Sequence, residues 1–251
     1  MIHASMNPNL IFDVGMADGA DTRFYLAKGF RVVAVEADPV TVARARVAFA
    51  QEVAEGKLEI VQCAVSDRDG RQTFYCNREQ PNWGSLRPGW GNAAAPAISA
   101  IEIETARLPT MFARYGVPYF AKIDIEGHDA VAVGPLAGCD DKPAYLSIEL
   151  HDPAGLQALA AAGYRSFKLV NQTMLWKVRL PNPPREGAVV RMDGWKGASG
   201  PFGRETPGRE WLSLSDAARF AEAFLELHRR QEFLVAGWID AHARLATPGV
   251  D

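Results

Sequence analysis

The sequence has few cysteines and no long apolar run. Cys63, Cys76 and Cys139 are widely spaced among 251 residues and form no C-x-x-C pair. This pattern argues against a disulfide framework and against a structural zinc site. No apolar segment approaches the roughly 18 residues of a membrane-spanning helix, and no basic N-terminal segment precedes an apolar core. We therefore expect a soluble, unexported protein of the reducing cytoplasm, without a membrane partner.

An excess of charge of one sign is also missing. The formal net charge is −3 and the pI is near 6.0. Proteins that bind duplex nucleic acid usually carry a basic stripe, so nucleic acid is not an expected partner. Hydrophobic residues make up 48% of the chain, which is enough to build the core of one enzyme-sized domain.

What the sequence does contain is a βαβ pattern near its start. The apolar residues 10–12 lead through Asp13 into a turn bracketed by Gly15 and Gly19, and a helix is expected to begin near Asp21. Glycines allow a turn too tight for side chains. The backbone N–H groups at the start of the helix would then face a ligand.

The second strand of this unit, residues 31–35, is nearly all β-branched or small. Such a strand is typical of a parallel sheet buried on both faces. It stops at Glu36, which Ala37 follows, and an acid at this point of a βαβ unit can accept hydrogen bonds from ribose hydroxyls. A glycine turn that serves only chain reversal is the alternative, and Glu36 makes it the less favoured one.

The composition of the turn indicates which nucleotide it would bind. A dinucleotide fingerprint is spaced G-x-G-x-x-G, whereas this chain has G-x-x-x-G with Met16 and Ala17 in the middle. Asp18 and Asp21 would place two carboxylates beside a pyrophosphate. S-adenosylmethionine (SAM) has no phosphate and carries a positive sulfonium and an ammonium group. The turn therefore favours SAM over NAD.

Residues 57–65 are expected to form a third strand, followed by a turn at residues 66–70. Ligands of open parallel sheets lie beyond the carboxyl ends of the strands. Cys63, Ala64, Val65 and Ser66 are therefore placed to flank an adenine, although plain loop packing explains each of them about equally well.

Residues 77–100 form a polar segment without a clear period, in which Trp83 and Trp90 flank residues 84–88. Exposed loop tryptophans can offer a flat contact surface to a ligand, although a tryptophan that anchors its loop to the core is the commoner case. We expect this segment to cover part of the molecule.

Two clusters of ionisable residues follow later strands. The strand expected at residues 119–125 carries Asp124 and continues into Glu126 and His128, and the strand expected at residues 144–150 is followed by a second cluster. Both strands end at the ligand edge of the sheet. The catalytic candidates are therefore Asp124, His128, Glu149 and His151. A solvated or capping histidine explains either imidazole equally well.

These motifs resemble the FkbM-type branch of the class I SAM-dependent methyltransferases. The resemblance is carried by DVGMADGADT, FYLAKGFRVVAVEADP, CAVSDRDG, the GSL of residues 84–86, KIDIEGHD and YLSIEL, in the family's order over about residues 10–175. Asp18 stands where many members have Asn. Only nine residues precede the first strand, so segments that relatives place there to bind the acceptor must come from elsewhere.

The resemblance implies an α/β, Rossmann-like class I methyltransferase fold, a mostly parallel seven-stranded sheet with helices on both faces. It implies that Gly15 and Gly19 form the SAM loop, that Glu36 holds the ribose, and that Asp124 lies near the methionine end. It also implies methyl transfer to oxygen, typically a hydroxyl of a sugar, glycan or natural product. The full set of candidate cofactor-binding residues is Asp13, Gly15, Ala17, Asp18, Gly19, Asp21, Glu36, Ala37, Ala64, Val65, Ser66 and Asp124.

The last third of the chain is expected to extend this core. We assign residues 1–180 to the SAM-binding core and residues 181–251 to a lid and a C-terminal helix. Residues 181–211 are rich in Gly and Pro and contain Trp195, Phe202 and Trp211, which suggests a lid or acceptor wall. Residues 213–245 are expected to be helical, with Ser213 or Ser215 as the N-cap. This helix would pack on the core or on a second subunit, which leaves a homodimer open.

Methyl transfer to a hydroxyl requires alignment, exclusion of water and removal of a proton. His128 is the first candidate base, followed by Glu149 and His151. A divalent cation held by Asp124, Glu149 and Asp152 is a further hypothesis, because such a cation would lower the acceptor's pKa. Two other functions stay open, a noncatalytic SAM-binding protein and, less favoured, an NAD-linked oxidoreductase.

Overall fold

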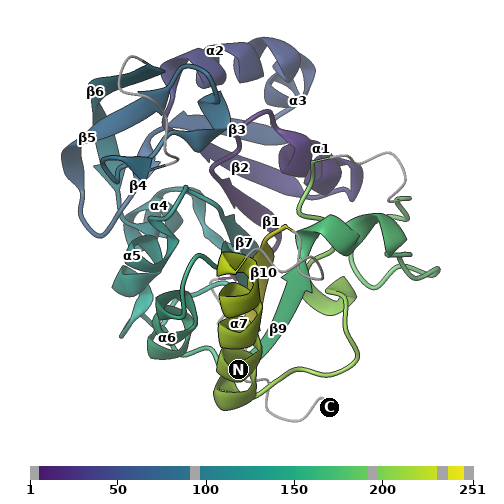
Figure 1. Cartoon of the computed structure of the whole chain (residues 1–251). Coiled ribbons are helices and arrows are strands. Elements are labelled where there is room, and N and C mark those ends of the chain that lie inside the picture. Colours follow the sequence, from purple (N-terminus) through teal and green to yellow (C-terminus); the bar gives the residue numbers. More distant parts are fainter. Residues whose placement is uncertain (1–5, 91–96, 192–196, 231–236, 246–251) are drawn as a thin grey trace.

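A seven-stranded sheet forms the centre of the molecule in a computed structural model that describes residues 6–90, 97–191, 197–230 and 237–245 (Figure 1). The strand order is β3-β2-β1-β7-β8-β10-β9. Neighbours from β3 to β8 are parallel, whereas β10 runs antiparallel to both β8 and β9. The strands are β1 (Met6–Val14), β2 (Arg31–Glu36), β3 (Leu58–Gln62), β7 (Val117–Ile123), β8 (Tyr145–Glu149), β9 (Ser166–Asn171) and β10 (Ile239–Arg244).

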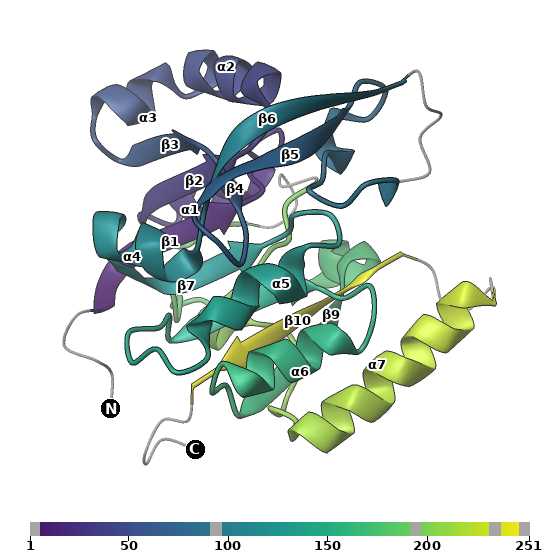
Figure 2. The same cartoon turned by 90° about the vertical axis from the view of Figure 1, so that its left-hand side faces the viewer.

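Apolar residues of β1 alternate between the two faces of this sheet. Leu10, Phe12 and Val14 belong to one core cluster, which α4 (Leu108–Tyr115), α5 (Asp129–Val133), α6 (Ala154–Ala161) and α7 (Leu214–Arg229) complete. Ile11 belongs to a second cluster with residues of α1 (Ala20–Ala27) and α2 (Pro39–Ala48). Figure 2 shows α4, α5 and α6 along the first face. The expected mostly parallel sheet with helices on both faces is confirmed.

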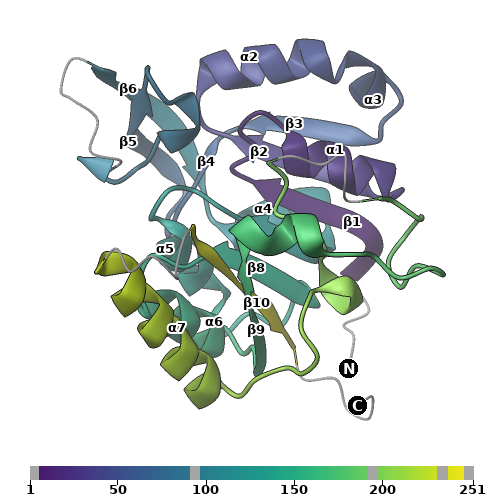
Figure 3. The same ribbon diagram turned by 45° about the vertical axis from the view of Figure 1, so that its right-hand side comes forward.

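A smaller sheet projects beside the large one, as Figure 3 shows for its hairpin. Its order is β4-β6-β5, with β4 (Ala64–Val65), β5 (Gly70–Asn77) and β6 (Ile98–Ala106). The strand expected at residues 57–65 is therefore two strands, because the chain leaves β2 after Cys63 and pairs with β6 instead. The remaining elements are α3 (Ala50–Ala54), η1 (Pro81–Trp83), η4 (Gly134–Leu136), η5 (Gln172–Lys177) and η7 (Gly203–Glu205).

The C-terminal helix is shorter than expected. α7 begins after Ser213, whose Oγ accepts a hydrogen bond from the N–H of Asp216 at 3.2 Å, so the predicted N-cap is confirmed. The helix ends at Arg229, and the prediction of a helix as far as Leu245 is wrong. β10 instead occupies the position between β8 and β9, with five of its six residues buried. Part of the expected C-terminal extension is thus a strand of the core sheet.

The cysteines are unpaired, and Cys63 and Cys76 are buried. Burial raises the pKa of the Cys63 thiol to about 11, so this cysteine is a weak nucleophile at neutral pH. Within the described ranges, no helix combines the length and the apolar character needed to cross a membrane.

Candidate cofactor and active site

A cavity of about 270 Å³ lies beyond the carboxyl ends of β1, β2 and β7. β1 pairs with β2 on one side and with β7 on the other, so the cavity lies where the order of the strands reverses. Ligands of open α/β sheets bind at this position. The predicted cofactor residues that line the cavity are Gly15, Ala17, Asp18, Asp21, Glu36, Ala37, Ala64, Val65 and Asp124.

The glycine turn lets the loop after β1 pass close to the loop after β7. Gly15 has φ of +82°, and its N–H donates to the carbonyl oxygen of Val35 at 2.9 Å. A Cβ at Gly15 would lie 1.8 Å from the carbonyl oxygen of Asp124, so no other residue fits without moving the backbone. Gly19 precedes α1 with φ of +78°, and a Cβ there would lie 2.6 Å from the Phe49 ring. Gly19 therefore shapes the turn but does not line the cavity.

Glu36 is fixed at the edge of the cavity by backbone donors. Its Oε2 accepts from the N–H of Ala17 at 3.0 Å, and its Oε1 accepts from the N–H of Asp38 at 2.8 Å. Burial raises the pKa of Glu36, and these backbone hydrogen bonds oppose that rise. Because each carboxylate oxygen can accept more than one hydrogen bond, Glu36 keeps capacity for a diol.

A row of charged groups forms the floor between β1 and β7. Lys122 is 5% exposed, and its Nζ lies 3.1 Å from Oδ2 of Asp21 and 3.2 Å from Oδ2 of Asp124. Burial by itself would lower the pKa of Lys122, but the surrounding carboxylates raise it well above its usual value. Asp13 lies beneath this row and outside the cavity lining, where its Oδ2 accepts from the Thr22 hydroxyl at 2.5 Å. Burial raises the pKa of Asp13 to about 7.

Carboxyl groups dominate the charge of the cavity. Lys122 is the only lysine or arginine among the described lining residues, against Asp18, Asp21, Glu36, Asp124 and Glu126. Such a lining repels phosphate and attracts a cation. The donor set fits SAM, which has a sulfonium, an ammonium group and no phosphate, better than it fits NAD.

Glu126 also lines the cavity, and it is not among the site residues predicted from the sequence. Its backbone has φ of +55°, and the Ser85 hydroxyl donates to its carbonyl oxygen at 2.7 Å. Its Oε2 accepts from Nε1 of Trp90 at 2.8 Å. A left-handed non-glycine residue costs about 1 kcal/mol or more, which these contacts from one loop offset. Burial raises the pKa of Glu126 to about 7, with the Trp90 hydrogen bond opposing.

His128 lines the cavity and precedes α5, whereas the predicted Ser66 supports it from behind. The Ser66 hydroxyl lies 3.1 Å from Nε2 of His128, and Ser66 is buried. Burial lowers the pKa of His128 below its usual 6.5. The imidazole is therefore neutral at neutral pH and can accept a proton.

The other two catalytic candidates do not line the cavity. His151 Nε2 lies 3.2 Å from Oε2 of Glu149, and its ring packs edge-on against Trp90 at 4.7 Å between centroids. Burial opposes the charge of His151, but the partnership with Glu149 raises its pKa overall. The four catalytic candidates therefore lie in two places. Asp124 and His128 line the cavity, whereas Glu149 and His151 lie outside its lining, with His151 against Trp90.

The expected cation site is not formed by its three residues. Among the described residues, no group of three or more His, Cys, Asp or Glu side chains is placed to hold a metal. Asp124 pairs with Lys122 and Glu149 pairs with His151. Asp152 instead accepts from the N–H of Ala154 at 2.7 Å, at the start of α6.

The two loop tryptophans have different positions. Trp83 lines the cavity and is 45% exposed, so it offers a face to a ligand. Trp90 anchors its loop to Glu126 and His151. The neighbouring Gly84 lies against Phe74, where a Cβ would be 2.6 Å from the ring. The anchoring role expected from the sequence is thus confirmed for Trp90, whereas ligand contact by Trp83 stays a prediction.

Of the three aromatic residues expected to form the lid, the two that the structure describes, Phe202 and Trp211, do not line the cavity. Phe202 is fully buried in the core, and Trp211 is partly buried beside Tyr145. Trp195 lies outside the described residues. The segment does reach the cavity through Gly197 and Ser199, which are not among the site residues predicted from the sequence.

The sheet order, the antiparallel β10 and the cavity at the β1–β7 crossing define a class I, Rossmann-like methyltransferase fold. The model of the methyltransferase FkbM domain matches residues 13–175. The chain belongs to this family. No curated protein matched the chain.

Several solved structures resemble this one at low identity. Methyltransferase FkbM from Methylobacillus flagellatus KT is 16% identical, with 72% of this chain and 42% of that chain covered and a TM-score of 0.44. This chain thus spans less than half of that protein. A precorrin-6y C5,15-methyltransferase from Geobacter metallireducens GS-15 is 10% identical, with 98% of this chain and 83% of that chain covered and a TM-score of 0.42. A SAM-dependent methyltransferase from Geobacter sulfurreducens, in complex with S-adenosyl-L-homocysteine, is 10% identical, with 96% of this chain and 86% of that chain covered and a TM-score of 0.38.

Proposed function

We propose that this protein transfers the methyl group of SAM to a hydroxyl oxygen of a sugar, glycan or natural product. The observation that carries the proposal is the carboxylate-rich cavity at the β1–β7 crossing, in a chain of a methyltransferase family. Its charge suits a sulfonium and disfavours a dinucleotide. The alternative is a noncatalytic SAM-binding protein, which only an assay of methyl transfer distinguishes from an enzyme.

The cavity offers each part of SAM a suitable environment. Glu36 would accept hydrogen bonds from the ribose hydroxyls. Ala37, Ala64 and Val65 line the part of the cavity beside β2 and β4, and would contact the adenine. The charged row of Lys122 and its two carboxylates would hold the amino-acid end. SAM supplies the electrophilic methyl group, and the protein's residues bind it and orient it.

The acceptor hydroxyl must lose its proton as the new bond forms. We propose His128 as the base, because its imidazole is neutral and lines the cavity. Glu126 is the second candidate, because a carboxyl group with a pKa of about 7 is also matched to proton transfer at neutral pH. The half-exposed indole of Trp83 would contact the apolar face of a sugar or a flat ring.

The first test is calorimetric binding of SAM, S-adenosylhomocysteine and NAD to the wild type and to Glu36→Ala. We expect micromolar SAM binding that the variant weakens severely. Preference for NAD, or no SAM binding, would overturn the proposal. A screen of hydroxyl acceptors with methyl-labelled SAM then follows, and saturable SAM binding without any methylation would favour the noncatalytic alternative.

The same labelled assay distinguishes the two bases. His128→Gln should lower kcat by a factor of about 10² to 10⁴, the usual contribution of a positioned base, while the affinity for SAM changes little. If Glu126→Gln lowers kcat instead and His128→Gln does not, the proton passes to the carboxylate.

A further inference from the structure

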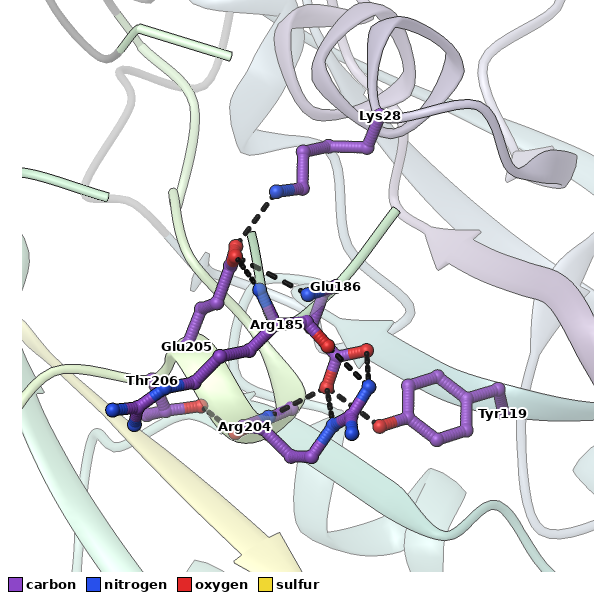
Figure 4. A network of polar contacts seen from close by, with 8 residues as sticks. Lys28, Tyr119, Arg185, Glu186, Arg204, Glu205 and Thr206 are labelled. Atoms are coloured by element: carbon purple, nitrogen blue, oxygen red, sulfur yellow. Dashed lines mark hydrogen bonds and ion pairs between the residues drawn. The ribbon is translucent and has the colours of Figure 1, made fainter. Parts of the chain in front are cut away.

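A segment beyond the family match crosses the α1 side of the sheet. We call residues 185–191 and 197–206 the strap. Nζ of Lys28, the residue after α1, lies 2.7 Å from Oε2 of Glu205, and both side chains are fully buried (Figure 4). The other carboxylate oxygen accepts from the N–H groups of Arg185 at 2.8 Å and Glu186 at 3.2 Å. Glu205 thus ties two parts of the strap to the C-terminal end of α1.

Further contacts hold the strap against β7. The carboxylate of Glu186 accepts from the Tyr119 hydroxyl at 2.6 Å and from the N–H of Arg204 at 2.7 Å (Figure 4). The Phe202 ring is fully buried and stacks on Phe120 at 4.9 Å between centroids. These contacts come from residues of β7 and of the strap itself, so the strap is a fixed part of the fold.

The strap also reaches the opposite end of α1, at the cavity. Asp21 lies in the first turn of α1, and its Oδ1 accepts from the N–H of Ser199 at 2.7 Å. Its Oδ2 accepts from the Ser199 hydroxyl at 3.0 Å and lies 3.1 Å from Nζ of Lys122. Ser199 itself lines the cavity. One residue of the strap therefore orients both oxygens of a carboxylate in the charged row.

We propose that Ser199 is a positioning residue of the cofactor site, which fixes Asp21 and Lys122 for the amino-acid end of the ligand. The inference rests on the proposed function, because it takes SAM as that ligand. The ligand's carboxylate would meet the Lys122 ammonium, and its ammonium group would meet the carboxylates of Asp21 and Asp124. Charge-assisted hydrogen bonds depend on the orientation of their partners. Binding costs less free energy when these side chains are already held in the orientation that the ligand needs.

The geometry also explains why the amino-acid end belongs here. The cavity's lysine, with its two carboxylates, lies beside β1 and β7. Four of the apolar lining residues, Ala37, Ala64, Val65 and Phe74, come from the β2 side and from the small sheet. A zwitterionic group fits the first region, and a planar, uncharged adenine fits the second.

The test compares two ligands by calorimetry on the wild type, Ser199→Ala and Ser199→Thr. S-adenosylhomocysteine has the amino-acid end, whereas 5′-methylthioadenosine has the same adenosine and thioether without it. We expect Ser199→Ala to bind S-adenosylhomocysteine about tenfold more weakly, the scale of one hydrogen bond to a charged group, and to bind methylthioadenosine as the wild type does. Ser199→Thr keeps the hydroxyl and should restore most of the affinity.

Ser213→Ala is the matched control, because it removes another serine hydroxyl that bonds an aspartate, at the start of α7 and outside the cavity lining. It should leave both affinities unchanged. Equal weakening of the two ligands by Ser199→Ala would show a merely structural role and overturn the inference, as would unchanged S-adenosylhomocysteine binding. A wild type that binds neither SAM nor S-adenosylhomocysteine would instead refute the proposed function, and the inference with it.

Discussion

The affinity for SAM should rise with pH through neutrality, because a carboxyl group of the cavity ionises there. Burial raises the pKa of Glu126 to about 7, and the nearby carboxylates of Asp124 and Glu149 add to that effect. A group with this pKa is about 9% ionised at pH 6 and about 91% ionised at pH 8. The ionised carboxylate attracts the sulfonium of SAM, so binding strengthens as the proton is lost.

The size of the effect follows from linkage. If SAM binds only the ionised form of Glu126, the association constant at pH 8 exceeds that at pH 6 by about tenfold, which corresponds to about 1.4 kcal/mol. S-adenosylhomocysteine has a neutral sulfur and should show a smaller dependence. Glu126→Gln keeps the size of the side chain and removes its titration, so the SAM profile should flatten toward that of S-adenosylhomocysteine.

Calorimetry at several pH values, in buffers of different ionisation enthalpy, measures both the affinity and the protons released. Close to half a proton should be released by SAM at pH 7. Trp90→Phe is a second probe, because it removes the indole hydrogen bond that lowers the pKa of Glu126. The midpoint of the pH profile of SAM affinity should therefore move to higher pH. Parallel profiles for the two ligands, or a tenfold change that survives Glu126→Gln, would refute the reasoning.

Two further predictions concern the packing around the cavity. Glu205→Leu should lower the free energy of unfolding, measured in urea, by about 3–5 kcal/mol, because it leaves the Lys28 ammonium buried without its partner. Lys28→Met should lower it by less, because only the loss of Glu205 also leaves two backbone N–H groups without their acceptor. Equal losses of stability in the two variants would contradict this account. Gly15→Ala should abolish SAM binding in calorimetry, because its Cβ would lie 1.8 Å from the carbonyl oxygen of Asp124, and wild-type affinity in that variant would show that the turn can yield.

The features that local rules govern could be predicted from the sequence. The glycine turn, α1 and the acid at the end of β2 lie within 30 residues, and each depends on its neighbours along the chain. Glu36, Asp124 and His128 line the cavity because parallel strands bring their carboxyl ends to one edge. Position in the topology is enough to place such residues.

β6 and β10 differ in how clearly the sequence indicates a strand. β6 alternates Ile101 and Ile103 with glutamates, which is the pattern of a half-buried strand and is visible in the sequence. β10 offers no such signal, because Asp240 and His242 are both buried in it. Burial lowers the pKa of His242 to about 3, so its imidazole is neutral in a core position where apolar periodicity would predict an aliphatic residue.

The contacts that complete the cavity depend on residues far apart in the sequence. Ser199 meets Asp21 across 178 positions, and Trp90 meets Glu126 across 36. No periodicity or local motif specifies such a pair, because either residue is compatible with many partners. The carboxylates of Asp21 and Glu126 are thus recognisable in the sequence as charged residues near a strand end or a helix start. The orientation of these two carboxylates is set only when the strap packs against Asp21 and the loop that carries Trp90 packs against Glu126. The family match ends at residue 175, whereas the lining of the cavity continues beyond it to Gly197 and Ser199.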